Sequence, residues 1–500
     1  MALMGLDIGT SGCKCTIFTE SGEKCSYAYN EYQTINKKEG HFELDPEEVW
    51  TAVKSVISEA VQKNNKEKVT ALCVSSFGEA GIPLDEKGRI LHNSILYTDK
   101  RGSEQCNFLI NQLGLEKIMK LTGLRAHPMY TISKVMWIKE NMPELYSKIW
   151  KVMLFEDFIL YRLGGVVSID YSLASRTMAF NIKEKNWENI ILNEAGIKND
   201  IFSEPVPSGT VVGTIKPNLA EKLGLSRKVK LVTGGHDQVC AATGGGIFQE
   251  GVAIDSTGTV ECITPAFNKP LLNEKMLNYN FACVPHARQD MYVTYAFNFT
   301  GGSLLKWYRD NFAKIYKKRA EKKGKNVYQI LDEQAAENPT DLLVLPHFAG
   351  AGTPFMDMSA RGAVLGLSFD TDDSKFYRGL LEGVTYEMLY NIECLEKAGI
   401  EIKSLKAVGG GARSELWLQI KADIMGRKIS ALDVEEAGTL GTVILAGTAT
   451  GIYKSIDKAA KSLISIKKEY YPDKENHEKY MEQYQKYKKM YEMVKEVMER

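Results

Sequence analysis

The sequence predicts an α/β protein whose two halves are related. Short apolar segments typical of buried strands alternate with helical patterns over most of its 500 residues. Two of these segments, which begin at Leu3 and Val252, each contain an aspartate near their end and run into a turn rich in Gly, Ser and Thr. A chain of this length holds about two to four domains, and a repeated unit indicates that two of them are related. We place the boundary between residues 247 and 248.

The composition excludes several classes of partner. Lys and Arg together number 63, as do Asp and Glu, so no net charge would attract nucleic acid or an anionic membrane. We find no basic, apolar signal peptide and no run of about eighteen uncharged apolar residues. The nine cysteines are scattered, which argues against zinc and favours buried thiols. We expect a cytoplasmic protein without nucleic acid or membrane as a partner, and a homodimer stays an open alternative.

The first predicted element is a strand–turn–strand hairpin. Residues 3–8 form the first strand, Gly9-Thr10-Ser11-Gly12 the turn, and the second strand begins at Cys15. The turn could offer backbone N–H groups, two hydroxyls and the Lys14 ammonium to an anion. Its spacing is not that of a Walker loop. An ordinary hairpin is the alternative, because such turns are common.

Polar residues follow the next two predicted strands. A helix opening with the capping signal Asp45-Pro46-Glu47-Glu48 precedes the strand 69–74. That strand leads into Glu79, and the strand 95–97 leads into Asp99 and Arg101. Ligands of open α/β sheets bind beyond the carboxyl ends of strands. The sequence therefore makes Glu79, Tyr97, Asp99 and Arg101 candidates for a binding site, with surface charge as the alternative.

A second glycine turn lies near the middle of the chain. The strand ending at Val232 is followed by Gly234-Gly235 and then by His236-Asp237-Gln238. Such a turn exposes a carboxylate at a fixed position, as a general base requires. Asp is also a common helix cap, and this stretch taken alone favours a capping role for Asp237.

The second half repeats the hairpin and adds glycine-rich loops. Ser256-Thr257-Gly258-Thr259 forms the second turn, and Gly301-Gly302-Ser303 precedes an apolar helix. The strand 404–408 leads through three glycines to Ser414 and another helix. Glycines between strand and helix let a phosphate or a flat ring approach the backbone. Residues 457–500 are rich in Lys, Glu and Tyr, and we expect a solvated helix pair there.

The order of these motifs resembles that of the FGGY carbohydrate kinases, such as glycerol kinase, xylulokinase, gluconokinase and fuculokinase. It includes Asp7-Ile-Gly-Thr-Ser-Gly, Met129 to Asn141, Gly-Gly-His-Asp237-Gln, Ser256-Thr-Gly-Thr and Gly-Gly-Gly-Ala-Arg-Ser414. The resemblance implies two ribonuclease H-like domains of the actin, hexokinase and chaperone ATPase superfold, with ATP and a sugar in the cleft between them. Residues 1–247 would form the acceptor side and carry the catalytic base. Residues 248–500 would form the nucleotide side and end in the charged helices.

The resemblance also implies a role for each motif. Asp237 would be the catalytic base, and Asp7 and Asp237 would place Mg²⁺. The ATP site would comprise Gly9, Thr10, Ser11, Lys14, Ser256, Thr257, Gly258, Gly302, Gly410, Gly411 and Ser414. The acceptor site would comprise Gly78, Glu79, Tyr97, Arg101, Asp237 and Gln238.

The acceptor segment Ser75-Ser-Phe-Gly-Glu79 departs from its relatives. Glycerol kinases have Asn-Gln-Arg-Glu there and xylulokinases have Gln-Met-His-Gly, so Glu79 aligns with the glutamate but Gly78 stands where the arginine would be. We expect a short polyol or a xylulose-like ketose as the acceptor. The alternatives are a gluconate or deoxysugar kinase, an actin- or chaperone-like ATPase without a sugar, and a catalytically idle sensor.

Overall fold

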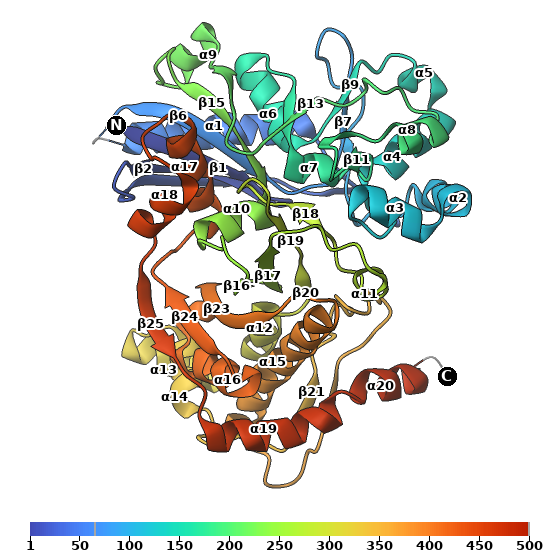
Figure 1. Cartoon of the computed structure of the whole chain (residues 1–500). Coiled ribbons are helices and arrows are strands. Elements are labelled where there is room, and N and C mark those ends of the chain that lie inside the picture. The colour runs from blue at the N-terminus through green and yellow to red at the C-terminus, as the bar shows by residue number, and fades with distance from the viewer. Residues whose placement is uncertain (65–66, 499–500) are drawn as a thin grey trace.

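Two mixed β-sheets organise the computed structural model, which describes residues 1–64 and 67–498 (Figure 1). The first sheet has the order β14-β15-β6-β1-β2-β3 and the second the order β18-β19-β17-β16-β23-β24-β25, with β20 also paired to β17. The strands of the first sheet are β1 Ala2–Ile8, β2 Gly12–Thr19, β3 Lys24–Glu31, β6 Val69–Ser76, β14 Val211–Thr214 and β15 Lys230–His236. Those of the second are β16 Gly251–Thr257, β17 Glu261–Phe267, β18 Val284–Pro285, β19 Tyr292–Val293, β20 Ala296–Asn298, β23 Ile402–Gly409, β24 Lys428–Leu432 and β25 Ile466–Tyr470.

The two sheets repeat one pattern of pairing. β2 pairs antiparallel with β1 and β3, and β6 pairs parallel with β1 and β15. In the second sheet β17 pairs antiparallel with β16 and β20, and β23 pairs parallel with β16 and β24. The predicted repeat of a strand–turn–strand unit is therefore confirmed, and each unit forms the centre of its own sheet.

Short strand pairs and helices complete the fold. The remaining strands are β4 Ile35–Lys38, β5 His41–Leu44, β7 Ile82–Leu84, β8 Ser94–Ile95, β9 Lys151–Met153, β10 Ser168–Asp170, β11 Phe180–Asn181, β12 Asn186–Trp187, β13 Glu204–Val206, β21 Leu343–Leu345 and β22 Ala363–Leu365. The helices of the first half are α1 Pro46–Lys63, α2 Ser103–Leu113, α3 Leu115–Thr122, α4 Thr131–Asn141, α5 Pro143–Tyr146, α6 Phe155–Gly164, α7 Tyr171–Ser175, α8 Asn189–Glu194, α9 Pro217–Lys222 and α10 Asp237–Gly244. Those of the second half are α11 Glu274–Asn278, α12 Gly302–Asn311, α13 Lys314–Lys323, α14 Val327–Gln334, α15 Asp373–Lys397, α16 Glu415–Met425, α17 Ala437–Ala449, α18 Ile456–Leu463, α19 Lys474–Tyr487 and α20 Met490–Met498.

Strand β1 is buried on both faces, which explains its continuous apolar sequence. Met4 and Leu6 pack in one core with residues of α1 such as Val53, while Leu3 packs in another with residues of α17 such as Val443. Helix α1 begins as its capping signal predicts, because the Asp45 side chain accepts the N–H of Glu47.

Helix α17 lies beyond residue 248, yet it packs on the first sheet and on α10. A Cβ atom at Gly244 of α10 would overlap the backbone of Ala437, and one at Gly441 of α17 would overlap that of Cys240. The two glycines therefore let these helices approach closely. The boundary at residues 247 and 248 stays a prediction, and any division of the chain has to account for this crossing of α17.

The prediction of a solvated helix pair at residues 457–500 is wrong over its described part, while residues 499–500 lie outside the described residues. Strand β25 pairs with β24 and extends the second sheet. Helix α19 buries Tyr480, Tyr484 and Tyr487 against the domain. These tyrosines recur at the helical spacing of one face, and that apolar periodicity outweighs the abundance of charge. No helix in the described parts of the chain is long and apolar enough to cross a membrane.

Candidate active site

Asp237 begins helix α10 directly after strand β15, which lies between β14 and β6 in the first sheet. His236 takes the N-cap position without a side-chain hydrogen bond, so the alternative in which Asp237 itself caps the helix is wrong. The Asp237 carboxylate instead accepts the N–H of Gln238 at 2.6 Å. A carboxylate in the first turn of a helix is favoured by the unpaired N–H groups there.

Burial and a neighbouring carboxylate change the acidity of Asp237. Its pKa is raised to about 7, first by burial and then by Asp7, with a smaller effect from Glu79. The charge of Arg176 acts in the opposite direction. The charges of Asp7, Glu79 and Arg176 therefore all act on Asp237, and its pKa suits a base that works near neutral pH.

Asp7 lies at the end of β1 and is only partly committed to protein partners. Its Oδ2 atom is 3.3 Å from Lys14 Nζ, whereas its Oδ1 atom is buried without a hydrogen-bond partner. Lys14 also pairs with Glu436, just before α17. An unpaired buried carboxylate oxygen is the kind of ligand that Mg²⁺ accepts, usually with water and phosphate completing its octahedron.

The donors for a metal are few. Over residues 1–64 and 67–498, no group of three or more His, Cys, Asp or Glu side chains is arranged to hold a metal ion. The charge of Asp7 acts on Asp237, so the two carboxylates lie on the same side of the site.

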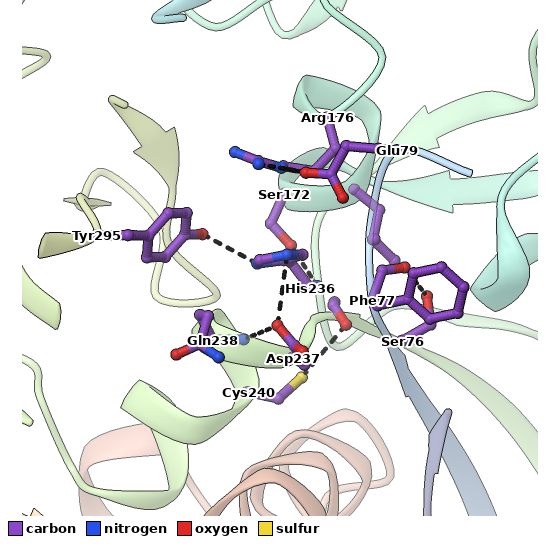
Figure 2. A network of polar contacts seen from close by, with 12 residues as sticks. Ser76, Phe77, Glu79, Ser172, Arg176, His236, Asp237, Gln238, Cys240 and Tyr295 are labelled. Carbon is purple, nitrogen blue, oxygen red and sulfur yellow. Dashed lines mark hydrogen bonds and ion pairs between the residues drawn. The ribbon is translucent and has the colours of Figure 1, made fainter. Parts of the chain in front are cut away.

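Arg176 and Glu79 form an ion pair near His236 and Asp237 (Figure 2). Arg176, from the end of α7, donates through Nε to Glu79 Oε1 at 2.6 Å. Both side chains are buried. Glu79 has a φ of 68°, a conformation that is uncommon for residues other than glycine and that clusters at functional sites.

A contact between His236 and Tyr295 joins the first half of the chain to the second. The imidazole Nδ1 of His236 lies 3.2 Å from the Tyr295 hydroxyl, and its Nε2 lies 3.4 Å from Asp237 Oδ1 (Figure 2). Burial, helped by the charge of Arg176, holds the pKa of His236 well below its usual value. The imidazole is therefore neutral at pH 7.

Buried side chains hold the backbone of the glycine turn. Glu156 of α6 accepts the N–H of Gly234 at 2.7 Å, and the Ser172 hydroxyl accepts the N–H of His236 at 2.8 Å. Ser172 in turn donates to Asp170 at 2.8 Å. Hydrogen bonds on both sides of Gly235 fix the path of the chain into Asp237.

A cavity of about 720 Å³ opens in the second half of the molecule, a size typical of small-molecule sites. It brings together five residues that the family resemblance assigned to the ATP site: Gly258, Gly302, Gly410, Gly411 and Ser414. Its other polar and aromatic walls include Ser303, Asn326, Tyr328, Gln329, Asp332 and Arg413.

The remaining predicted residues of the ATP site lie on the two hairpins. Gly9, Thr10 and Ser11 form the turn between β1 and β2, and Lys14 lies on β2. Ser256 and Thr257 end β16. The Thr257 hydroxyl accepts a hydrogen bond from the buried Lys421 at 2.8 Å, so its side chain points into the domain and only its backbone could face a phosphate.

Of the predicted acceptor residues, Tyr97 and Gln238 lie close to Asp237, whereas Arg101 is bound to other side chains. The carboxylates of Glu79 and Asp237 contribute to the raised pKa of Tyr97, after its partial burial, so Tyr97 lies near both. Gln238 follows Asp237 directly. Arg101 is paired with Asp99 at 2.7 Å and Glu43 at 2.8 Å, and stacks on the Trp137 ring. Its charge is therefore already neutralised within the protein.

Sequence reasoning missed Arg176, Tyr295 and the residues that support the glycine turn. Arg176 follows a three-residue strand and a five-residue helix, elements too short to give a clear periodic signal. Tyr295 lies between β19 and β20 in a region without a glycine motif. The rule that polar residues cluster beyond strand ends, applied to residues 168–170, was the one signal that could have indicated Arg176.

The comparisons with known proteins agree over nearly the whole chain. A model of the N-terminal domain of the FGGY family of carbohydrate kinases matches residues 2–244, and one of its C-terminal domain matches residues 254–450. A xylulose kinase of Bacillus subtilis (strain 168) is 29% identical over 482 residues, which cover 96% of this chain and 94% of that protein. Glycerol kinase 1 of Clostridium tetani is 31% identical over 494 residues, with 96% of each chain covered. A gluconokinase of the same Bacillus strain is 28% identical over 486 residues, 96% of this chain and 93% of that one.

Solved structures confirm the predicted two-domain fold. A ligand-bound xylulose kinase from Lactobacillus acidophilus has a TM-score of 0.88 at 24% identity, covering 98% of this chain and 97% of that one. Plasmodium falciparum glycerol kinase with ADP has a TM-score of 0.86 at 22% identity, covering 98% of each chain. At these identities the likeness shows the fold alone.

Proposed function

Because the chain belongs to the FGGY family of carbohydrate kinases, we propose that it transfers the γ-phosphoryl group of ATP to a hydroxyl of a short ketose or polyol. The enzyme is a phosphotransferase that uses an alcohol group as acceptor, and Asp237 is its general base. The observation that carries this assignment is the partly exposed Asp237 carboxylate at the start of α10, whose pKa is raised to about 7 by desolvation and by the charge of Asp7.

The reaction needs a proton acceptor at the attacking hydroxyl. Asp237 accepts that proton as the oxygen attacks the γ-phosphorus, and the N–H of Gln238 keeps one of its oxygens oriented. Neutral His236 lies beside Asp237 but carries no charge that would compete for the proton. A base with a pKa near the working pH is both ionised and basic enough to act.

Charge on the transferred group has to be neutralised as well. The backbone N–H groups of the two hairpin turns and the Lys14 ammonium would bind the phosphate oxygens. Mg²⁺, when held by Asp7 and Asp237, supplies further positive charge to the phosphates. The cavity at Gly302, Gly410 and Gly411 would hold the rest of the nucleotide.

The names of the relatives leave several acceptors open. Xylulose, glycerol and gluconate kinases match the chain at similar identity, so identity alone does not select among them. A gluconate or deoxysugar kinase is the alternative within the family. An ATPase without a sugar acceptor is the alternative with the same fold.

Replacing Asp237 by Asn tests the proposal. The change keeps the shape but removes the proton acceptor, so we expect kcat to fall by about 10³-fold while ADP binding and the thermal midpoint stay close to those of the wild type. A coupled assay with ATP and a panel of C3–C6 polyols, ketoses and aldonates measures the rate.

Asp157→Asn is the control, since Asp157 is another aspartate with a raised pKa but is fully buried and bonds to Ser203 at 2.6 Å. It should keep near-normal kcat. Near-normal phosphorylation by Asp237→Asn would contradict the role of the base. ATP turnover that ignores every acceptor would favour the ATPase.

A further inference from the structure

Glu156 is a buried acid that the proposed mechanism does not use. Its side chain, on helix α6, is 0% exposed and contacts the glycine turn before Asp237. We propose that Glu156, together with Ser172, is a positioning residue that holds this turn and so orients the Asp237 carboxylate toward the acceptor hydroxyl. The inference rests on the proposed kinase function, and it gives neither residue any contact with a substrate.

Strand β15 is irregular just before Asp237. Its parallel pairing with β6 is regular from Lys230 to Thr233, and the register then shifts, so that Gly234 has no partner on β6. An extra residue in a strand bends it and changes the direction of the side chains that follow, and such irregularities are frequent next to active sites. The direction of Asp237 therefore depends on the conformation of Gly234 and Gly235.

Both glycines lie too close to their neighbours to carry a side chain. A Cβ atom at Gly234 would lie 2.0 Å from the Val74 carbonyl oxygen, and one at Gly235 would lie 2.8 Å from Ser172 Oγ. Because the two residues have no side chains of their own, they can be held in place only by contacts with their backbone.

Hydrogen bonds hold that backbone on both sides of Gly235. The N–H of Gly234 donates to Glu156 Oε1 at 2.7 Å, and the N–H of His236 donates to Ser172 Oγ at 2.8 Å (Figure 2). Glu156 lies on α6 and Ser172 on α7, so both acceptors come from outside the first sheet. The position of the turn is therefore set by these two helices as well as by the strands.

Asp170 joins the two supports into one buried network. Glu156 Oε2 accepts the N–H of Asp170 at 3.0 Å, and Asp170 Oδ2 accepts the Ser172 hydroxyl at 2.8 Å. The Asp170 carboxylate also accepts the N–H of Leu173 at 2.9 Å and the Ser208 hydroxyl at 2.7 Å. Glu156, Asp170 and Ser172 are all 0% exposed. A buried network whose members are satisfied is rigid, so α6, α7 and the turn keep fixed relative positions.

An acid at position 156 is costly to bury. Burial, and then the charge of Asp170, raise the pKa of Glu156 well above its usual value. An apolar side chain of similar volume would fill this space at a lower cost in desolvation. It would, however, leave the N–H of Gly234 without the acceptor that Glu156 supplies. Holding the turn is thus the role that explains the acid.

Steady-state kinetics of two Glu156 variants test the inference. Glu156→Leu removes the acceptor for the N–H of Gly234, and a displacement of a catalytic group by about 1 Å can lower a rate about 100-fold. We therefore expect kcat to fall by about 30- to 100-fold. The KM values of ATP and of the acceptor should stay within about 3-fold of those of the wild type, because Glu156 lines neither binding site. Glu156→Gln keeps an oxygen that can accept from Gly234 and should retain kcat to within about 5-fold.

Asp157→Leu is the matched control. Asp157 is the next residue on α6, is likewise 0% exposed with a pKa raised by burial to about 8, and accepts the Ser203 hydroxyl at 2.6 Å instead of a group of the turn. It should lower the thermal midpoint, as Glu156→Leu does, but keep kcat within about 3-fold at a temperature at which it is folded. A loss of kcat equal to that of Glu156→Leu would mean that kcat reports general damage to α6, and would overturn the inference.

A double-mutant cycle shows whether Glu156 acts through Asp237. In an Asp237→Asn background the carboxylate to be oriented is absent, so adding Glu156→Leu should lower the remaining rate by less than about 3-fold. A larger fall would show that Glu156 affects the rate by another route, and the positioning role would be wrong.

The same measurements separate this inference from the proposed function. If Asp237→Asn lowers kcat and Glu156→Leu does not, Asp237 is still the base and only the positioning role is wrong. If Asp237→Asn keeps the wild-type kcat, or if the wild type phosphorylates no acceptor, the proposed function itself is wrong. If Glu156→Leu does not fold, Ser172→Ala decides. It removes the acceptor for the N–H of His236 and should lower kcat by about 10-fold with both KM values unchanged, and an unchanged kcat would overturn the inference.

Discussion

The two strand–turn–strand hairpins share a backbone plan but differ in what surrounds their aspartates. In the first, Asp7 pairs with Lys14, whose side chain is 27% exposed, and the Asp7 side chain is itself 15% exposed. In the second, Asp255 and Glu261 enclose Lys421 at 2.6 and 2.7 Å, and all three side chains are at most 1% exposed. The first aspartate is available to a ligand, and the second is not.

This difference shows how one repeated motif can serve two purposes. The buried triad of the second hairpin has its charges compensated inside the protein, and Lys421 also binds the Thr257 hydroxyl directly below the turn. At Thr257, only the backbone can then bind a phosphate. The first hairpin keeps an orphaned carboxylate oxygen at Asp7, which suits a metal or a phosphate-bound water.

The sharpest test of the comparison replaces each aspartate by Asn. We expect Asp7→Asn to lower kcat by about 10²- to 10⁴-fold with little loss of stability, because it removes a carboxylate that would hold Mg²⁺ at the reacting phosphates. Asp255→Asn should keep kcat within about 10-fold at a temperature where it is folded. Rates measured on both purified variants check this, and equal losses would mean that the hairpins do not differ in function.

The free energy of unfolding should depend more on the charges of the second hairpin than on those of the first. Lys421→Met leaves Asp255 and Glu261 buried without a cation, which costs about 3–5 kcal/mol, equivalent to a fall in the thermal midpoint of roughly 10 °C. Calorimetry or a thermal-shift assay measures it. Lys406→Met is the control, since Lys406 donates only to the carbonyls of Gly245 and Gly246. If Lys406→Met lowers the thermal midpoint as much as Lys421→Met, the pairing of Lys421 with Asp255 and Glu261 is not the cause of the loss.

The smallest change that we expect is in the KM of ATP when Lys14 is replaced. Its neighbours Asp7 and Glu436 raise the pKa of the ammonium against the effect of burial, so it is charged at all working pH values. Lys14→Met should raise the KM of ATP by about 10-fold, the contribution of one partly exposed charge contact to a phosphate. It should leave the acceptor KM unchanged. An effect confined to the acceptor would move Lys14 away from the phosphates.

The sequence by itself determined the elements whose signals are local. The hairpin at Asp7, the capped helix after Asp45 and the glycine turn before Asp237 depend on strand alternation, capping and turn chemistry, which neighbouring residues control. The family followed from the order of these motifs. The resemblance to the family also implied that Gly258, Gly302 and Gly410 belong to one ATP site, and the three line one cavity.

Only the tertiary structure decided which of these residues face a ligand. Arg101 resembled a site residue, but its charge is used by Asp99 and Glu43, whereas Arg176 gave no signal and yet reaches Glu79 across 97 positions of the chain. The buried tyrosines of α19 were likewise hidden among its charges. Burial and pairing depend on side chains that are far apart in sequence, so the same Asp, Arg or Lys can be a ligand or a structural ion depending on contacts that no local pattern records.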